Sequence, residues 1–144
     1  EGKIESKLLD ELNSIEYYSK FNPKSLGIEW VINIIYNIID KYNIQVPDIL
    51  RTYSEHIAIQ TQNAIKNNAS TILITGGGVR NKFLIELITN RLENHINIPD
   101  DILIDFKEAL IFGFLGVLKL RGEINILKSV TGANKDHSSG MIYK

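Results

Sequence analysis

The sequence predicts a helix-rich α/β fold with a small, mostly parallel sheet. A short apolar run at 72–74 ends in three glycines and leads into a helical pattern, and a second short run at 95–98 precedes another helical pattern. Two strands that are each followed by a helix favour parallel pairing. Because a sheet of two strands is too small to be stable alone, we expect that missing sequence completes it or that helices dominate this chain.

Apolar residues recur at helical spacing in five segments and predict helices there. Two expectations about burial follow. The strand at 72–74 is apolar throughout, which is typical of a strand buried on both faces. The last helix is apolar on nearly every side, so we expect it to be buried as well. The predicted helices span residues 4–13, 28–41, 47–66, 82–93 and 104–120.

The ends of these segments carry ordinary boundary signals. Glu29 in the first turn and Lys41 in the last turn of their helix suit its dipole. Pro47 suits the first turn of the next helix. Residues 121–144 form a glycine-rich tail, in which 140–143 are a candidate last strand. We expect a helical part at residues 1–67 and an α/β part at residues 68–144.

Composition bounds the class of protein. The chain has 144 residues, 44% of them apolar and 23% charged, which is typical of a globular domain. A net charge of −1 gives no electrostatic argument for a nucleic-acid or membrane partner. The chain has no cysteine, which excludes disulfides and fits a reducing cytoplasm. It enters a helical pattern almost at once without an initiator methionine, so we expect it to be cut from a longer protein.

The strongest candidate site is the segment TILITGGGVRN at 71–81. Gly76, Gly77 and Gly78 lack a Cβ, so their backbone N–H groups are able to approach a ligand closely. Asn81 is a good N-cap for the helix that follows. A strand, a glycine turn and a helix N-terminus together favour a phosphorylated ligand, because free N–H groups and the helix dipole both attract an anion. A plain tight turn is the alternative.

Two common nucleotide motifs do not fit this segment. The dinucleotide fingerprint G-x-G-x-x-G has no match, since Arg80 and Asn81 follow the glycines. The phosphate loop of NTPases requires Ser or Thr after its lysine, but Phe83 follows Lys82. A nucleotide at this turn therefore has to bind in another way.

The helix at 104–120 carries two weaker candidates. Ala109, Gly113 and Gly116 share one face, which favours close approach of a flat ligand or, as the alternative, close helix–helix packing. Glu108 lies in the same apolar helix, and its carboxylate is able to bind a sugar hydroxyl. The alternative is that Glu108 lies at a solvated edge of the helix or forms a salt bridge.

No catalytic or metal site is predicted. We reject a catalytic triad at 136–138, because triads assemble from distant segments. The three histidines lack metal-ligand spacing. Asp100 and Asp101 after Pro99 are typical of a turn, and a metal-binding or catalytic pair is the less favoured alternative.

Four ordered motifs together resemble the carboxy-terminal half of the anhydro-N-acetylmuramic acid kinases. The glycine turn, TGGGVRN at 75–81, is similar to that family's glycine-triplet loop. PKSLGIE at 23–29 resembles its P-K-S-T-G-x-E segment, and EALIFG at 108–113 resembles its E-A-x-A-F-A helix. SVTGA at 129–133 and GMIY at 140–143 resemble its S-V-T-G-A and G-x-I-Y ending, so the resemblance covers nearly the whole chain.

The resemblance implies a fold and an activity. The family belongs to the superfamily of sugar kinases, actin and hexokinase, so the chain is expected to be part of the carboxy-terminal lobe of an actin-like, ribonuclease H-like ATPase. Such kinases use ATP, Mg²⁺ and water to open the 1,6-anhydro ring of anhydro-N-acetylmuramic acid and phosphorylate it to N-acetylmuramic acid 6-phosphate. This reaction recycles cell-wall sugar in the bacterial cytoplasm, and the resemblance favours a homodimer.

The resemblance also implies site residues. It assigns ATP binding to Gly76, Gly77, Gly78 and Asn81. The candidate cleft contacts are Lys24, Glu108 and Gly113.

The chain departs from the family in three ways. Leu26 stands where the family usually has threonine, and Gly113 where it has alanine. The first phosphate motif and the D-T-G-P-G-N segment with the catalytic base have no counterpart here. We expect both to lie before Glu1, so the chain alone is predicted to be inactive.

Two rival functions remain open. The first is another kinase or ATPase of the same superfamily with a different acceptor. The second is a helical dimerisation module without a nucleotide role, which the broad apolar face of residues 28–41 favours.

Overall fold

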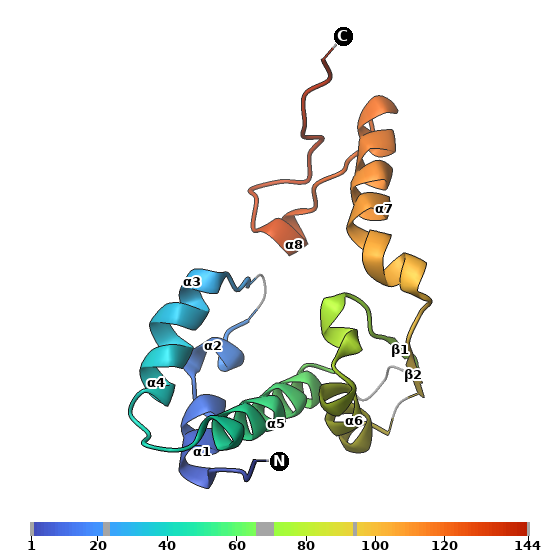
Figure 1. Ribbon diagram of the computed structural model, residues 1–144. Coiled ribbons are helices and arrows are strands. Elements are labelled where there is room, and N and C mark those ends of the chain that lie inside the picture. Colours follow the sequence, from blue (N-terminus) through green and yellow to red (C-terminus); the bar gives the residue numbers. More distant parts are fainter. Residues whose placement is uncertain (1, 22–23, 66–70, 94, 144) are drawn as a thin grey trace. The chain divides into compact units, whose positions relative to one another are not determined.

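The computed structural model of the chain describes residues 2–21, 24–65, 71–93 and 95–143 (Figure 1). By packing, the chain divides into two units, which are described separately below. The first unit comprises Glu1–Lys20 and Leu26–Pro99, and the second comprises Phe21–Ser25 and Asp100–Lys144. The predicted division into a helical part at residues 1–67 and an α/β part at residues 68–144 stays a prediction.

The first unit begins with helices, most of which lie where helical spacing predicts them. They are α1 (Ser6–Asn13), α2 (Glu16–Ser19), α3 (Ile28–Trp30), η1 (Val31–Tyr36), α4 (Asn37–Ile39) and α5 (Val46–Ala64). Pro47 lies in the first turn of α5, as expected. The helix predicted at 28–41 forms as α3, η1 and α4 in succession, and it ends at Ile39.

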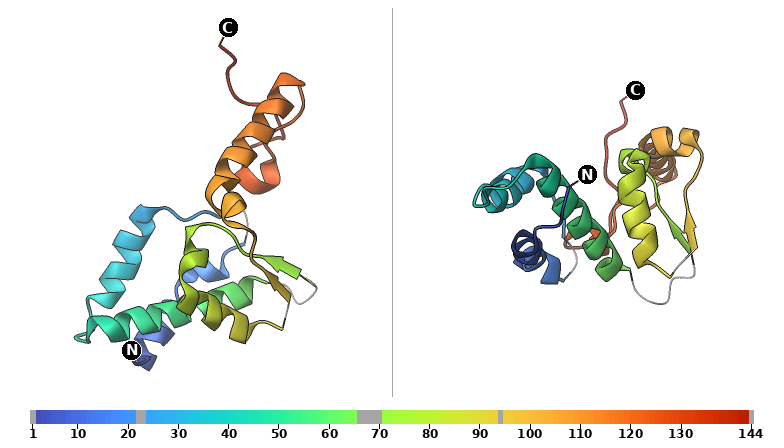
Figure 2. Two further views of the ribbon diagram at one scale, coloured as in Figure 1. Left: turned by 45° about the vertical axis from the view of Figure 1, so that its right-hand side comes forward. Right: turned by 60° about the horizontal axis from the view of Figure 1, so that its bottom comes forward.

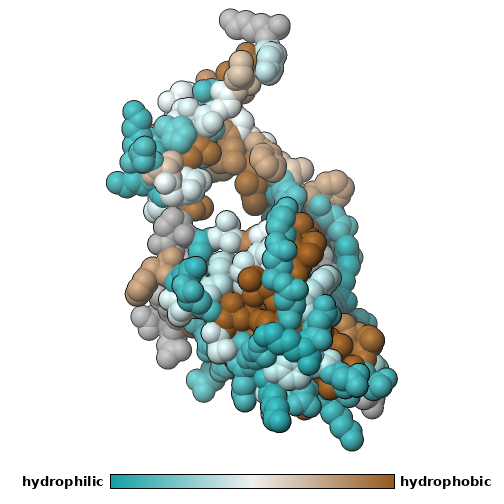
Figure 3. Space-filling view, turned by 90° about the vertical axis from the view of Figure 1, so that its left-hand side faces the viewer, coloured by the Kyte–Doolittle hydropathy of each residue, from teal (hydrophilic) through white to brown (hydrophobic). Residues whose placement is uncertain are grey.

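The middle of that helix, η1, is a π-helix. A π-helix closes its hydrogen bonds one residue later than an α-helix, so it changes which apolar residues share a face. On the predicted face, Ile35 and Ile38 are buried, whereas Ile34 is exposed. The apolar face predicted from 3.6-residue spacing is therefore only partly buried. On the face in Figure 3, apolar groups lie exposed between hydrophilic ones.

The core of the first unit joins α1 to the helices around it. Leu8, Leu12, Ile35 and Ile38 form a buried cluster, against which partly buried aromatic and aliphatic side chains pack. Helix α1 packs against both α5 and α4 (Figure 1). Burial of these aliphatic side chains is the main favourable contribution to this packing.

The α/β part of the first unit follows α5. Strand β1 (Thr71–Leu73) pairs in parallel with β2 (His95–Asn97), with Ile72 opposite Ile96. Helix α6 (Lys82–Arg91) connects the two strands and packs against α5 (Figure 2). The predicted parallel strand–helix–strand arrangement is confirmed, and the described part of the chain is a helix-rich α/β structure with a small parallel sheet.

The expectation that the first strand is buried on both faces is wrong for this chain. Ile72 is half-buried, but Thr71 is exposed and Leu73 is 55% exposed. The described sheet has two strands, so a β1 residue that does not face a helix has little else to pack against.

The second unit contains α7 (Asp101–Leu120), α8 (Lys128–Thr131) and an isolated antiparallel bridge between Ile126 and His137. The expectation that the last long helix is buried is wrong: Ile104 is buried, but much of the remaining apolar surface is exposed. The described residues of this unit outside α7 are too few to cover the apolar residues on all sides of that helix. Within those residues, no helix of either unit is long and apolar enough to cross a membrane.

The candidate strand at 140–143 does not form. Gly140 has φ of 98°, which is incompatible with an extended strand. The segment therefore continues the irregular tail.

Candidate functional site

The glycine turn lies between β1 and α6. Gly76 has φ of 92° and ψ of 168°, a conformation that residues with a Cβ rarely adopt, so glycine is required there. A short 3₁₀ turn, Gly77–Arg80, follows. It is closed by hydrogen bonds from Val79 N to Gly76 O at 3.0 Å and from Asn81 N to Gly78 O at 3.1 Å. The chain thereby reverses direction within a few residues and enters α6.

The other two glycines face open space. A Cβ built on Gly77 or Gly78 would meet no atom within 4 Å, so the packing of the described residues does not require glycine there. The N–H groups of these two residues donate no hydrogen bond to any described residue. Both glycines are exposed, and unpaired N–H groups near a helix N-terminus are what an anion there requires.

Asn81 is the N-cap of α6, as predicted. Its side-chain Oδ1 accepts a hydrogen bond from Leu84 N at 3.1 Å, which satisfies one of the open N–H groups of the first turn. The cap fixes where α6 begins and therefore where its positive end points.

Thr75 immediately precedes the turn and carries an unsatisfied hydroxyl. Its Oγ1 is buried and has no hydrogen-bond partner among the described residues. Such a group is unusual, because leaving a buried polar atom unpaired costs about 1–3 kcal/mol.

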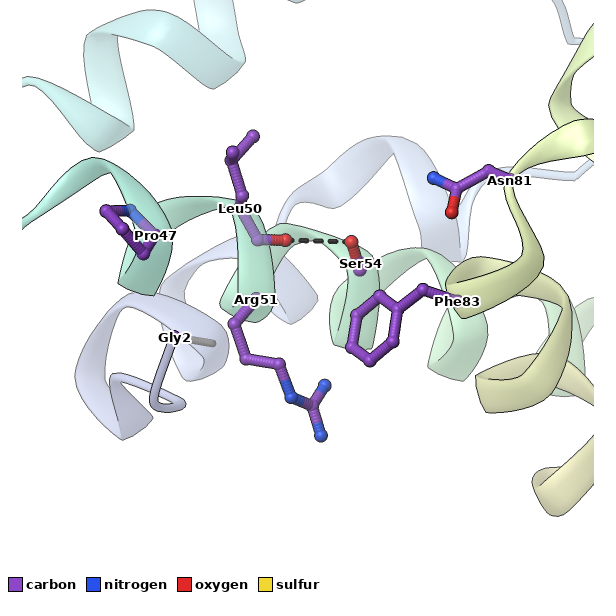
Figure 4. A pocket seen from close by; sticks show the side chains of 7 residues that line it. All are labelled: Gly2, Pro47, Leu50, Arg51, Ser54, Asn81 and Phe83. Atoms are coloured by element: carbon purple, nitrogen blue, oxygen red, sulfur yellow. Dashed lines mark hydrogen bonds between the residues drawn. The ribbon is translucent and has the colours of Figure 1, made fainter.

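A pocket of about 660 Å³ lies beside the turn, within the first unit. Asn81 and Phe83, from the beginning of α6, point toward α5 (Figure 4). The amino-terminal segment of the chain lines another side of the pocket through Gly2. A hydrogen bond from Lys3 N to Asp48 Oδ1, 2.6 Å long, joins this segment to α5. The lining residues are Gly2, Pro47, Leu50, Arg51, Ser54, Asn81 and Phe83.

Gly2 allows the amino-terminal segment to lie directly on α5. A Cβ at this position would be 1.9 Å from Pro47 O, so a larger residue would push the segment away from the pocket. Glu5 N, further along the segment, donates to Thr52 Oγ1 at 2.9 Å. Together with the bond to Asp48, this contact holds the segment against α5.

Arg51 is held rigidly at the pocket. Its guanidinium carbon lies 5.3 Å from the centre of the Phe83 ring, a distance typical of a cation–π contact. The same guanidinium pairs with Glu55, and Arg91 of α6 pairs with the other oxygen of that carboxylate. Burial alone would raise the pKa of Glu55, but the hydrogen bonds from Arg91 and Arg51 outweigh it and lower that pKa. Glu55 is therefore ionised and orients both arginines.

A second buried polar group, His56, lies on the same helix. Its Nδ1 lies 2.7 Å from Asn13 Oδ1, and its Nε2 lies 2.9 Å from Tyr18 Oη. Asn13 Oδ1 also accepts from Gln60 Nε2, so Nδ1 of His56 is the protonated nitrogen and Nε2 accepts from Tyr18. Burial lowers the pKa of His56 to about 4 and raises the pKa of Tyr18 to about 12. His56 is therefore neutral and structural.

The predicted cleft contacts lie in the second unit, whereas the glycine turn lies in the first. Glu108 and Gly113 are exposed on α7. Lys24 is exposed in the irregular segment that precedes α3. The helix face of Ala109, Gly113 and Gly116 shows no close packing at its glycines, since a Cβ on either would meet nothing within 4 Å. The roles of these residues stay predictions.

Asp100 and Asp136, for which the sequence predicts no catalytic or metal-binding role, each accept a backbone hydrogen bond. Asp100 Oδ1 accepts from Leu103 N at 2.9 Å and caps α7. Asp136 Oδ1 accepts from Lys128 N at 2.7 Å. Within the described ranges, no three His, Cys, Asp or Glu residues are grouped so that they would hold a metal ion.

Sequence reasoning missed the pocket residues of α5. Leu50 and Phe83 lie in the helices predicted at 47–66 and 82–93, but helical spacing does not indicate that these two helices meet. The spacing of Arg51 and Glu55, four residues apart in a predicted helix, is the one signal that points to a paired and oriented arginine. Their association with Arg91 and Phe83 depends on packing of α6 against α5.

A parallel strand, a glycine turn and a capped helix make the first unit an α/β structure with a strand–turn–helix segment of the kind at which a helix N-terminus is able to accept an anion. Comparison with known proteins identifies the family. The sequence profile of the anhydro-N-acetylmuramic acid kinases matches residues 1–144, so the chain belongs to that family.

Individual relatives agree with this assignment. The chain is 36% identical to the anhydro-N-acetylmuramic acid kinase of Francisella tularensis subsp. novicida (strain U112), over 98% of the chain and 40% of that protein. It is 31% identical to the kinase of the same name from Sulfurovum sp. (strain NBC37-1), over 99% of the chain and 40% of that protein. For the Clostridioides difficile (strain 630) kinase the identity is 35%, over 92% of the chain and 37% of that protein. The chain thus spans about 40% of the length of these relatives.

Proposed function

We propose that this chain is the carboxy-terminal part of an anhydro-N-acetylmuramic acid kinase and that its glycine turn binds ATP. The observation that carries the proposal is the turn itself: the N–H groups of Gly77 and Gly78 are unpaired among the described residues, and both residues are exposed. Gly76 supplies the required backbone conformation, and Asn81 fixes the start of α6. A family match over the whole chain supports the same ligand.

The proposed fold of the intact enzyme is an actin-like, two-lobed kinase, of which this chain forms part of the carboxy-terminal lobe. The described α/β arrangement is consistent with a portion of such a lobe. Lys24, Glu108 and Gly113 are proposed to face the cleft between the lobes. This assignment is based on motif resemblance alone.

The proposed reaction transfers the γ-phosphoryl group of ATP to O6 of the sugar. Water adds to the anomeric carbon as the bond from that carbon to O6 breaks, and O6 then carries the phosphoryl group, which gives N-acetylmuramic acid 6-phosphate and ADP. Phosphoryl transfer relies on positioning and on neutralising charge, and Mg²⁺ usually bridges the phosphates of the nucleotide. The contribution proposed for this chain is to hold the nucleotide through backbone N–H groups, while the base that activates water comes from sequence that this chain lacks.

The proposed setting is recycling of cell-wall sugar in the cytoplasm of a bacterium. We also propose that the intact enzyme is a homodimer. Ile28, Ile32 and Tyr36 are 63%, 49% and 53% exposed, so the helix at 28–39 offers apolar surface for contact with a second subunit.

The experiment that tests the activity uses the full-length protein that carries this chain. The protein is incubated with ATP, Mg²⁺ and anhydro-N-acetylmuramic acid, and the products are identified by mass spectrometry. We expect N-acetylmuramic acid 6-phosphate and ADP. A folded full-length protein that phosphorylates another sugar, with anhydro-N-acetylmuramic acid inert, would instead select a related sugar kinase.

A further inference from the structure

We propose that the pocket between α5 and α6 binds the purine base of the nucleotide, with the Arg51 guanidinium as the surface on which the base stacks. The inference deepens the proposed function and rests on it for the identity of the ligand. It assigns a role to Arg51, Ser54 and Phe83, for which the sequence motifs provide none.

The position of the pocket supports this assignment. Asn81 caps α6 directly after the glycine turn and also lines the pocket. A nucleotide whose phosphates lie at the turn therefore has its remaining part beside the pocket mouth. A volume of about 660 Å³ is ample for a nucleoside and lies within the range of small-molecule sites.

The stacking surface is already formed. The Arg51 guanidinium is fixed on one side by Glu55 and lies over the Phe83 ring. A planar guanidinium stacks readily on flat aromatic systems, and one that is held in place loses little freedom when a base binds. Phe83 is 46% exposed and Leu50 is 62% exposed, so a base in the pocket would cover apolar surface that solvent now contacts.

The polar groups of the pocket suit a base as well. Oδ1 of Asn81 is used by the cap, and its NH₂ group forms no hydrogen bond with a described residue, so it is available to donate. Ser54 Oγ donates to Leu50 O at 2.8 Å and keeps its lone pairs for an incoming donor. One donor and one acceptor beside a flat cation complement the ring nitrogens and the amino group of adenine.

The local charge favours an electron-rich ligand. Glu55 is one carboxylate between two guanidiniums, those of Arg51 and Arg91. The cluster therefore keeps a net positive charge at the pocket. Because a positive charge also attracts phosphate, the test has to separate base binding from phosphate binding.

The test compares two ligands on the full-length protein by calorimetry. ADP carries the base, whereas inorganic tripolyphosphate has phosphates alone. We expect Arg51→Ala to weaken ADP binding roughly tenfold, since a desolvated cation–π contact has about that strength. Tripolyphosphate binding should weaken clearly less, because that ligand loses one positive charge of the cluster but no stacking surface. Arg51→Lys, which keeps the charge but not the planar group, should lose most of the same affinity. Arg121→Ala removes another arginine that pairs with a glutamate but does not line the pocket, and is the matched control.

A second variant covers the case in which Arg51→Ala disturbs the buried Glu55. Leu50→Trp places a large ring in the pocket without removing a buried contact, and we expect it to weaken ADP binding tenfold or more. The control for Leu50→Trp is Val46→Trp. Val46 is 64% exposed, close to the 62% of Leu50, but Val46 does not line the pocket.

Three results would overturn the proposal. They are unchanged ADP affinity in both Arg51→Ala and Leu50→Trp, an equal loss of affinity for ADP and tripolyphosphate, and a folded wild-type protein that does not bind ADP. If the wild-type protein binds ADP in the predicted way but does not phosphorylate the sugar, the proposed reaction fails and the base pocket is retained.

Discussion

Thr75 holds a hydroxyl that the described protein does not satisfy. Its Oγ1 is buried without a hydrogen-bond partner, immediately before the glycine turn. Thr75→Val keeps the shape of the side chain and removes the unpaired oxygen, so we expect the free energy of unfolding to rise by about 1 kcal/mol. The measurement is urea-induced unfolding of the two proteins side by side.

The control for this prediction is a threonine whose hydroxyl is used. Thr52 is fully buried, donates to Asp48 O at 2.7 Å and accepts from Glu5 N at 2.9 Å. Thr52→Val should destabilise the protein by about 1–3 kcal/mol, because it leaves these groups unpaired. If Thr75→Val also destabilises, the hydroxyl has a partner and the interpretation is wrong.

His56 makes stability depend on pH. Its pKa is lowered by burial to about 4 from 6.5, so the unfolded chain takes up a proton before the folded protein does. The free energy of unfolding therefore falls as pH drops through 6.5 toward 4, by roughly 2 kcal/mol between pH 7 and pH 5. Denaturant unfolding at several pH values above 5 measures this before most carboxylates are protonated.

Two variants identify the group responsible. His56→Gln retains hydrogen-bonding groups without a titration and should abolish most of the slope between pH 7 and pH 5, although its stability at pH 7 is lower. His95 is exposed, and His95→Gln should leave the slope in place. A slope that survives in His56→Gln would show that another group controls the pH dependence.

At the scale of the element, Asn81 serves helix and ligand through different atoms. Its Oδ1 caps α6, and its NH₂ is the group proposed to face the nucleotide. Asn81→Ala should cost about 1 kcal/mol of stability. Asn81→Asp keeps a capping oxygen and suits the helix dipole, so its stability should match that of the wild type, while its negative charge should raise the KM for ATP.

Thermal unfolding and steady-state kinetics of the two variants separate these effects. The prediction fails if Asn81→Asp retains both wild-type stability and a wild-type KM for ATP. It also fails if Asn81→Asp is as unstable as Asn81→Ala, because the cap would then not depend on Oδ1.

Helix α7 shows that hydrophobic composition alone does not decide burial. Phe106, Leu110 and Phe114 are 63%, 63% and 60% exposed, whereas Ile104 is 8% exposed. A helix that is apolar on all sides needs neighbours on all sides, and the described part of the second unit does not supply them.

At the scale of the whole molecule, we expect the 144-residue chain alone to be catalytically inactive. It contains no counterpart of the family's first phosphate motif or of the segment with the catalytic base, and phosphoryl transfer requires nucleotide, Mg²⁺ and acceptor to be held together. The chain and the full-length protein are assayed in parallel for ADP release with anhydro-N-acetylmuramic acid. Turnover by the chain, at a rate that follows its concentration, would contradict the expectation.

The sequence by itself determined the features that depend on neighbouring residues. The glycine turn after β1, the cap at Asn81 and the proline at the start of α5 each follow from the conformations and hydrogen bonds that a residue type permits over a few positions. The parallel pairing of β1 and β2 follows from the helix between them. The family motifs are local in the same sense.

Only the tertiary structure decided which distant side chains meet. The packing of α6 on α5 places Phe83 and Arg91 beside Arg51 and Glu55, and forms the pocket. Contact between α5 and the helices before it surrounds His56 and so sets its pKa. The burial predicted for β1 and α7 from their apolar residues is wrong for the same reason. Burial depends on what packs against an element and not on the element's own residues.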